Sequence, residues 1–419
     1  MMKLLFEDQA YSYETLRAAG YASGGGADLG EIIASCTTIA PGDQESWWQA
    51  WHSLAARLDG QGQQLLDAGD QVSAESCWLR ASNYYRTAEF FLHGNPDDPQ
   101  IYQTSQRAVQ AFAKVAAGDP AVPGSMRERL EITEISIPYQ TSTLPGWWLS
   151  PQTGAEVTSS RPTLIITGGF DSTAEELYFV AGRDAVLRGW NCLIFDGPGQ
   201  GRALREQGLF YRPDWEAVIS PVIDFCLGRP GVDENQIALL GMSQGGYFSA
   251  RAAAFEPRIA ALVSWDGVYD VASALRGMLP GHVIEAALAG RLDEADEALA
   301  ELAQHSGTLH WALANGTWSY GLSRPAEFVV EMFKYTLADG IAERISCPTL
   351  IFDAEDEHFF PGQPAELEKH LKAPVERHLM LASEGAGEHC NAGSLSNFHA
   401  VLFPWLNQVL PQQAALEPR

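Results

Sequence analysis

Five short, continuously apolar segments between residues 162 and 352 most constrain the fold of this 419-residue chain. None alternates polar with apolar side chains, and an unbroken apolar run of strand length is typical of parallel strands buried on both faces. The segments are 162–167, 191–195, 236–240, 260–265 and 348–352. Helical patterns separate them at about 174–188, 214–228, 244–256 and 363–371. Strand–helix alternation of this kind predicts a doubly wound, mostly parallel α/β sheet.

The chain before these strands is expected to be helical and then to enter the sheet. Up to about residue 125, apolar and aromatic side chains recur at helical spacing over 45–58, 73–92 and 100–117, with Ser73 as a candidate N-cap. Residues 131–137 then alternate as a half-exposed strand does, and 146–149 form another short apolar run.

A long gap separates the strand ending at Trp265 from the strand beginning at Pro348. It contains helical patterns at 282–304, 308–314 and 325–338. A helical insertion here would lie over the strand ends, where α/β proteins bind ligands. The predicted organisation is a helical N-terminal domain, a core in two parts and a helical cap, at residues 1–125, 126–270 with 346–419, and 271–345.

The segment from Gly241 to Gly245 reads Gly-Met-Ser-Gln-Gly, between an apolar run and a helix start. A nucleophilic serine of the Gly-x-Ser-x-Gly type needs this context, because it must sit at the tip of a sharp, strained turn. The glycines leave room where the strand and helix backbones approach each other. Ser243 is therefore the candidate nucleophile.

A serine hydroxyl needs a base, and in this architecture the chain order is serine, acid, histidine. His389 lies in the glycine-containing segment 384–390, just before a predicted final helix from about 395 to 410. The other nine histidines fall in predicted helices or strands, in the cap, or beside the candidate acid. We predict that His389 is the base.

The acid that orients this histidine should follow the strand at 348–352. Asp353 falls too early, at the end of the strand, whereas Asp356 and Glu357 lie in the loop. Either carboxylate could orient the imidazole and stabilise its cation. Asp266, after the preceding strand, is a third candidate. Residue type favours Asp356, and the choice stays open at this point.

Fixed N–H donors should stabilise the oxyanion that forms on the substrate. One is the backbone N–H of Gln244, directly after the nucleophile. The other is expected from the loop 168–172, where we assign the N–H of Phe170, with Gly169 as the adjacent choice. A glycine turn made only for tightness is the alternative interpretation of this loop.

Four aromatic residues near the expected site could line an aromatic, substrate-binding pocket. Two follow the strand 260–265 and two lie in the predicted cap: Trp265, Tyr269, Trp311 and Trp318. Core residues would show the same pattern.

Composition argues against several classes of function. A formal net charge of −26 disfavours nucleic acid and anionic membranes as partners, since both require basic patches. No run approaches the roughly 20 apolar residues of a membrane span, and the N-terminus turns acidic before a signal-peptide core could form. Six scattered cysteines without a Cys-x-x-Cys pair indicate reduced thiols in a cytoplasmic protein. No metal-ligand spacing appears, and we expect neither a metal nor a cofactor.

Together these motifs resemble the α/β-hydrolase superfamily, and more narrowly the branch with 2,6-dihydroxypseudooxynicotine hydrolase and the fungal heptaketide-shortening hydrolases. The resemblance begins at about residue 45. It rests on a helical N-terminal part and on the segments 168–173 with 175–176, 196–201, 241–246, 256–261 with 264–265, and 387–390.

The resemblance implies cleavage of a C–C bond next to a ketone in a β-diketone-like or polyketide substrate, with Ser243 as nucleophile and His389 as base. The family acid lies four residues before the proline of its loop, in a Gly-x-x-Asp pattern. Here that position is Glu357, and Ala354 stands where glycine is usual. The family often forms dimers, so a homodimer is a further expectation.

Other functions would use the same residues. A carboxylesterase or peptidase of small acyl substrates shares every catalytic group, and an acyltransferase or cyclase would replace water with another nucleophile. A non-catalytic binder of the same fold has no need of Ser243 or His389.

Overall fold

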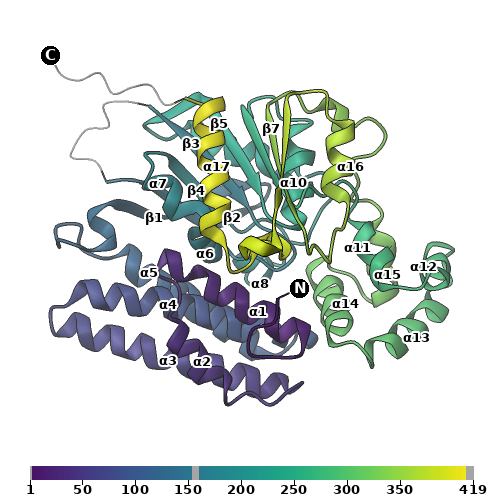
Figure 1. Ribbon diagram of the computed structural model, residues 1–419, viewed down its shortest axis with the longest axis horizontal. Coiled ribbons are helices and arrows are strands. Elements are labelled where there is room, and N and C mark those ends of the chain that lie inside the picture. The colour runs from purple at the N-terminus through teal and green to yellow at the C-terminus, as the bar shows by residue number, and fades with distance from the viewer. Residues whose placement is uncertain (1, 153–159, 412–419) are drawn as a thin grey trace.

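A computed structural model describes residues 2–152 and 160–411 (Figure 1). Its centre is one eight-stranded sheet with the order β1-β2-β4-β3-β5-β6-β7-β8, in which β1, β2 and β4 pair antiparallel and the remaining neighbours pair parallel. The strands are β1 Leu130–Tyr139, β2 Ser142–Pro151, β3 Arg161–Thr167, β4 Asn191–Phe195, β5 Val232–Gly241, β6 Ala261–Trp265, β7 Thr349–Ala354 and β8 Val375–Met380. The predicted mostly parallel α/β sheet is confirmed.

The central strands are buried on both faces, as their unbroken apolar runs predict. In β3, Ile165 faces one apolar cluster, whereas Leu164 and Ile166 face a second cluster on the other side of the sheet. Successive side chains of a strand point to opposite faces, so both faces need apolar residues. The edge strand β8 was not predicted, because exposed polar residues such as Glu376 and Arg377 leave it no apolar run.

Helices cover both faces of the sheet. They are α6 Ala174–Leu177 and α7 Arg183–Val186, joined by a π-helical turn at Tyr178–Gly182, with α8 Gly201–Arg205, α9 Glu216–Leu227, α10 Gln244–Ala253, α16 Gln363–His370 and α17 Leu395–Val409. Among the described residues, no helix is long and apolar enough to cross a membrane.

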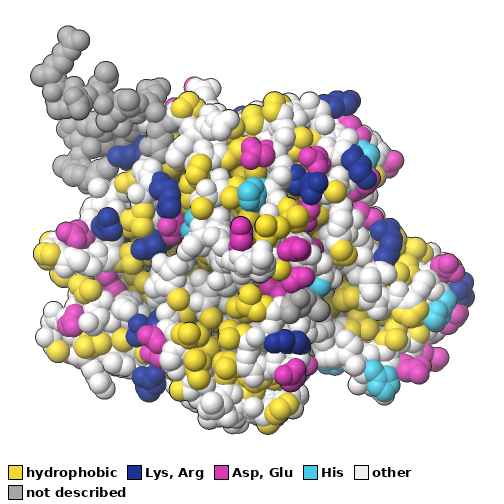
Figure 2. All heavy atoms as spheres, viewed as in Figure 1, with side chains coloured by type: hydrophobic (Ala, Val, Ile, Leu, Met, Phe, Trp, Pro, Cys, Tyr) yellow, Lys and Arg dark blue, Asp and Glu magenta, His cyan; other side chains and the backbone are white. Residues whose placement is uncertain are grey.

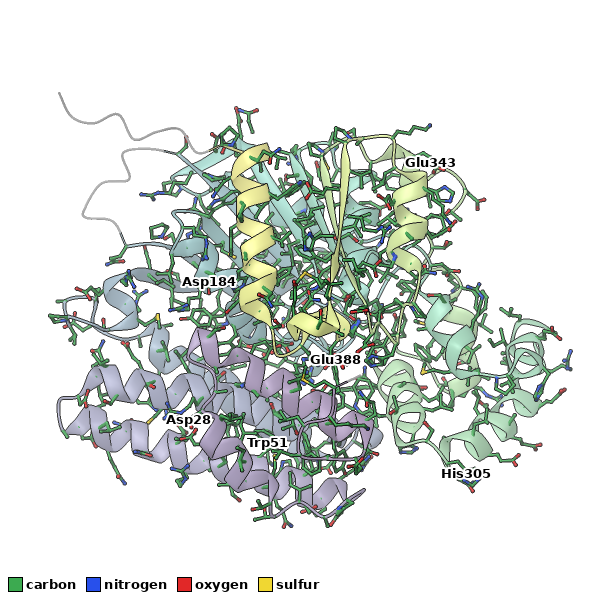
Figure 3. All side chains as sticks on the ribbon, viewed as in Figure 1. Asp28, Trp51, Asp184, His305, Glu343 and Glu388 are labelled. Carbon is green, nitrogen blue, oxygen red and sulfur yellow. The ribbon has the colours of Figure 1, made fainter. Side chains whose placement is uncertain are left out.

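The N-terminal part consists of α1 Gln9–Gly20, α2 Leu29–Cys36, α3 Gln44–Asp67, α4 Gln71–Glu89 and α5 Pro99–Ala116 (Figure 1, purple). Trp51 lies among these helices (Figure 3) and is fully buried. The N-cap of α4 is Asp70, which accepts from the Ser73 N–H at 3.0 Å, so the prediction of Ser73 as N-cap is wrong. Helix α1 was not predicted because it is buried from Tyr11 to Ala18 and therefore has no single apolar stripe.

The insertion between β6 and β7 forms five helices: α11 Ala272–Met278, α12 Gly281–Leu288, α13 Leu292–Ala303, α14 Gly307–Ser319 and α15 Pro325–Met332. Helix α14 lies beside the N-terminal helices (Figure 1) and packs on the short turn η2 at Phe90–Gly94. Acidic side chains are spread over the core, the N-terminal helices and the insertion on the face in Figure 2.

A buried cluster of charges joins the N-terminal helices to the loop after β3. Arg17 contacts Glu176 at 2.7 Å and Asp171 at 2.8 Å, and Arg86 contacts Asp171 at 2.5 Å and Glu14 at 2.9 Å. All five side chains are mostly excluded from water. Because buried charges need partners, this cluster fixes the N-terminal helices against one defined segment of the core.

Candidate active site

Ser243 occupies the tight turn between β5 and α10, at the carboxyl end of the sheet. Its backbone has φ 59° and ψ −126°, a conformation that L-residues rarely adopt. A Cβ on Gly241 would collide with the carbonyl oxygen of Gly245, and a Cβ on Gly245 would lie 2.7 Å from the carbonyl oxygen of Gly168. The two glycines therefore permit a strained turn that exposes the serine hydroxyl.

His389 reaches Ser243 from the loop between β8 and α17. Its Nε2 lies 2.8 Å from Ser243 Oγ. The backbone at Cys390 and Asn391 has positive φ, and Tyr13 of α1 donates to the His389 carbonyl oxygen at 3.1 Å. Figure 3 labels the neighbouring Glu388 where this loop meets the N-terminal helices. Two distant parts of the chain thus hold the histidine in place.

Glu357, rather than Asp356, lies against this histidine. The Glu357 Oε2 atom is 2.7 Å from His389 Nδ1, and its Oε1 accepts from the N–H groups of Phe359 and Phe360 at 2.7 and 3.0 Å. Asp356 donates its own N–H to the carbonyl oxygen of Gly387 at 2.8 Å. The loop position four residues before Pro361 therefore supplies the carboxylate that contacts the imidazole.

Asp266 approaches the same imidazole nitrogen from the end of β6. Its Oδ2 lies 3.4 Å from His389 Nδ1. Cys390 donates to the Asp266 carboxylate through its thiol at 2.8 Å and through its N–H at 3.3 Å. Asp266 also has a positive φ of 69°. Two of the three acids considered from the sequence thus face one histidine.

The protonation of Glu357, Asp266 and His389 depends on their burial and on the charges that they carry beside one another. Burial would raise the pKa of Glu357, but the His389 charge and the hydrogen bonds to the carboxylate lower it to about 2. Burial raises the pKa of Asp266 to about 7. Burial would lower the pKa of His389, but the Asp266 and Glu357 carboxylates raise it to about 9. The imidazole therefore binds a proton strongly, with Glu357 as its ionised partner.

Two backbone N–H groups near Ser243 are available to bind an oxyanion. Within residues 2–152 and 160–411, the N–H groups of Phe170 and Gln244 have no protein acceptor, and both residues line the cavity that contains Ser243. The Gly169 N–H instead donates to Ser172 Oγ at 2.9 Å. Gly169 is therefore no longer a candidate oxyanion donor. The N–H groups of Phe170 and Gln244 remain as the two candidates.

Ser243 and His389 open into a cavity of about 340 Å³. Its walls come from α1, from the turn η2, from the inserted helices and from the loop after Glu357, and they are mainly apolar: Tyr13, Phe90, Phe91, Leu309, Phe328, Met332 and Phe359. We expect from the sequence that the N-terminal domain and the cap together close over the site, but no single segment has enough of these residues to identify the individual lining side chains.

Of the four aromatic residues considered as pocket residues, two line this cavity. Trp265 and Trp311 do so. Tyr269 stacks on His370 at 4.6 Å, and Trp318 packs against Arg205 and lines a separate surface pocket. The assignments of Tyr269 and Trp318 are corrected accordingly.

Asp266, His389 and Cys390 are the one group of described residues close enough to share a metal ion. Metal binding by cysteine requires the thiolate, and burial together with the Asp266 charge raises the pKa of the Cys390 thiol well above its usual value. The donor set is therefore a poor match for a metal, and its hydrogen bonds serve the histidine loop.

Comparison with known proteins identifies the family of the chain. No protein-family model matches. The chain is 37% identical to hydrolase LUC6 of Fusarium sp, over 97% of this chain and 98% of that protein. It is 33% identical to 20-hydroxy-prefusarin hydrolase FUS2 of Gibberella moniliformis, over 97% and 98%.

Solved structures agree on the fold. The crystal structure of 2,6-dihydroxy-pseudo-oxynicotine hydrolase superposes with a TM-score of 0.71 at 21% identity, over 94% of this chain and 95% of that one. The 37% and 33% identity to LUC6 and FUS2 extends over nearly the whole length of both relatives, and this assigns the chain to their family. The chain belongs to the α/β hydrolases, in the group of fungal hydrolases that includes LUC6 and FUS2.

Proposed function

We propose that this protein is a serine hydrolase that cleaves a C–C bond next to a ketone in a β-diketone or polyketide-like small molecule. The observation that carries the proposal is the chain of contacts from Glu357 through His389 to Ser243, at 2.7 and 2.8 Å, on the wall of a mainly apolar cavity. A nucleophile, a base and an orienting carboxylate in this order are the elements of acyl transfer to serine.

The first half of the reaction forms an acyl-enzyme. His389 takes the proton of Ser243 as its Oγ attacks the substrate ketone, and the N–H groups of Phe170 and Gln244 stabilise the oxyanion. The C–C bond then breaks, its electron pair leaves as an enolate, and the imidazolium returns the proton to the enolate carbon. The raised pKa of His389 suits this step, because the imidazole holds a proton until the carbanion forms.

Water completes the second half. His389 removes a proton from water, the hydroxide attacks the acyl carbonyl carbon, and Ser243 leaves with the proton that the histidine returns. The products are a carboxylic acid and a ketone, so the net reaction consumes one water molecule.

The cavity supports a small, mainly apolar substrate. Its volume of about 340 Å³ and its aromatic and aliphatic walls suit such a molecule rather than a folded polypeptide. The relative FUS2 is named for hydrolysis of one compound, 20-hydroxy-prefusarin. An apolar cavity also supports a second candidate, acyl transfer or cyclisation, because an internal nucleophile can replace water where water is scarce.

Mass spectrometry of products from wild type and Ser243→Ala tests the proposal. The panel holds 1,3-diketones, matched aryl esters and aminoacyl amides. Cleavage of diketones into acid and ketone, lost in Ser243→Ala, is the expected result. Ser249→Ala is the control, since Ser249 is a buried serine of α10, the helix that follows Ser243, and its hydroxyl donates to Gly246 O.

Each other outcome is informative. Turnover of esters or amides alone would replace C–C hydrolysis by the esterase or peptidase function. Diketone consumption with a cyclic product and no incorporation of ¹⁸O from water would favour cyclisation. Failure of a fluorophosphonate to label Ser243 in the wild type would overturn the serine mechanism altogether.

A further inference from the structure

The loop that carries the Phe170 N–H is held by two side chains through the carbonyl oxygen of Gly169. Tyr211 Oη donates to the carbonyl oxygen of Gly169 at 2.7 Å, and Gln200 Nε2 donates to the same oxygen at 2.9 Å. In a planar trans peptide, the C=O of one residue and the N–H of the next point in opposite directions. Fixing the Gly169 carbonyl towards Tyr211 therefore fixes the direction of the Phe170 N–H.

The nucleophile lies directly beside this peptide. A Cβ on Gly169 would lie 2.9 Å from Ser243 Cβ and 3.3 Å from its Oγ, so the backbone of Gly169 is packed directly against the serine. The Phe170 N–H, which has no acceptor among the described residues, shares the cavity with Ser243. Rotation of this one peptide would remove the donor from the site without moving the serine.

Helix α14 of the insertion and its C-cap residue Tyr320 contact Phe170, Tyr211 and Gln244. Asn315 Nδ2 donates to the carbonyl oxygen of Phe170 at 3.2 Å. Four residues later, the Ser319 carbonyl oxygen accepts from the Tyr211 N–H at 3.0 Å. The next residue, Tyr320, accepts through its hydroxyl from Gln244 Nε2 at 2.5 Å. One turn of one helix thus reaches both residues that carry the proposed oxyanion donors.

The contacts of α14 are themselves buried and anchored. Asn315 is 2% exposed, and its Oδ1 lies 2.9 Å from Nδ1 of His93 in the turn η2. The rings of Tyr211 and Tyr320 lie 4.8 Å apart. Both polar atoms of the Asn315 side chain are occupied, so its orientation is determined by the N-terminal part on one side and by the oxyanion loop on the other.

We propose that Tyr211 and Asn315 are positioning residues that orient the oxyanion donor at Phe170, and that α14 completes the oxyanion site when it is packed against the core. The inference rests on the proposed serine mechanism. It assigns to the insertion a part in transition-state stabilisation as well as in enclosing the substrate. Neither residue touches the reacting atoms, and each acts through the peptide groups on either side of Phe170.

The test measures reaction at Ser243 without needing the natural substrate. A fluorophosphonate reacts with the serine and places its P=O oxygen where the oxyanion forms, so its second-order labelling rate reports the donors. We expect Tyr211→Phe and Asn315→Leu each to slow labelling by about tenfold, a fraction of the 10²–10³-fold cost of removing a donor outright. Thr317→Ala on the same helix is the matched control, because among the described residues the Thr317 hydroxyl hydrogen-bonds only to Leu313 O of its own helix.

A second readout separates positioning from folding. On a substrate that wild type turns over, the positioning variants should lose kcat with KM changed less than threefold, and should lose affinity for an aryl boronic acid in the same proportion. Thermal melting identifies any variant that fails to fold, and Tyr211→Phe, which removes one hydroxyl, is the variant expected to fold normally.

The outcomes distinguish this inference from the proposed function. Wild-type labelling at Ser243, with folded Tyr211→Phe and Asn315→Leu labelled at the wild-type rate, would overturn the inference and leave the serine hydrolase intact. Absence of labelling in wild type would overturn both. A rise in KM with kcat unchanged would assign these residues to substrate binding and contradict the positioning role.

Discussion

The two loops that present a carboxylate to His389 differ in what surrounds the acid. The Glu357 carboxylate accepts two backbone N–H groups besides the imidazole, whereas the Asp266 carboxylate accepts a thiol and one longer N–H contact. Both are buried, yet the pKa of Glu357 falls and that of Asp266 rises. The His389 charge and its hydrogen bond lower the pKa of Glu357 most, and the two backbone N–H groups lower it further, whereas burial and the Glu357 charge raise the pKa of Asp266. The comparison teaches that, of two buried acids beside one base, the acid bonded to the imidazole and to backbone donors stays ionised.

Replacement of Glu357 tests this comparison most severely. Glu357→Gln keeps the shape but removes the charge that stabilises the imidazolium, so we expect kcat/KM to fall by about 10³–10⁴-fold, as for loss of a triad acid. Steady-state kinetics with the substrate found in the product panel measures the loss. A decrease of less than tenfold would mean that Asp266 serves as the orienting acid.

The next largest effect is expected in the dependence of kcat/KM on pH. The raised pKa of His389 means that the neutral, base form is lost as pH falls through about 9, so kcat/KM should rise with pH up to that value. At pH 7 it should be roughly 100-fold below its plateau, since each pH unit below the pKa costs about tenfold. A profile that is flat between pH 6 and 9 would contradict the raised pKa.

Asp266→Asn should have a smaller effect of a different kind. The neutral amide removes a negative charge from the vicinity of His389, so the acid limb of the profile should move to lower pH while the plateau changes by less than about tenfold. Glu357→Gln, in contrast, should lower the plateau itself. Equal losses of plateau kcat/KM in the two variants would contradict the different roles given to Glu357 and Asp266.

The smallest effect is expected at Cys390, whose thiol donates to Asp266. Cys390→Ala removes one weak donor and leaves the Glu357 contacts unchanged, so we expect activity within about threefold of wild type. Any shift of the acid limb should be in the same direction as in Asp266→Asn and smaller, because loss of the thiol donor raises the pKa of Asp266 and so leaves less negative charge beside His389. Measurement of the full pH profile of Cys390→Ala decides this.

The sequence predicted the parts of this site that depend on local pattern. Ser243 could be found because a strand, a glycine-flanked turn and a helix follow one another, and the central strands because both of their faces are buried. The choice between Asp356 and Glu357 could not be made, since adjacent residues in a loop differ only in which backbone N–H groups they reach. That Asp266 would also face the histidine depends on the pairing of β6 with β7.

Features that depend on contacts between distant segments were beyond the sequence. Asn315 and Phe170 are 145 residues apart, and no periodicity relates them. Helix α1 lacks an apolar stripe because the rest of the chain surrounds it. Tyr269 and Trp318 could not be told apart from Trp265 and Trp311, because an aromatic residue has the same local pattern in a cavity wall and in a packed surface.

The buried charge cluster that joins Arg17 and Arg86 to Asp171 and Glu176 limits how such an enzyme can be recombined. An N-terminal segment exchanged from another hydrolase would have to bring two guanidinium groups to the same places, because an unpaired buried carboxylate costs about 3–5 kcal/mol. Asp171 directly follows Phe170 and, like Arg17, lines the cavity, so a mismatch would alter both this loop and the wall of the pocket. The N-terminal helices and the loop after β3 therefore form one exchangeable unit, and chimaeras should be joined outside it.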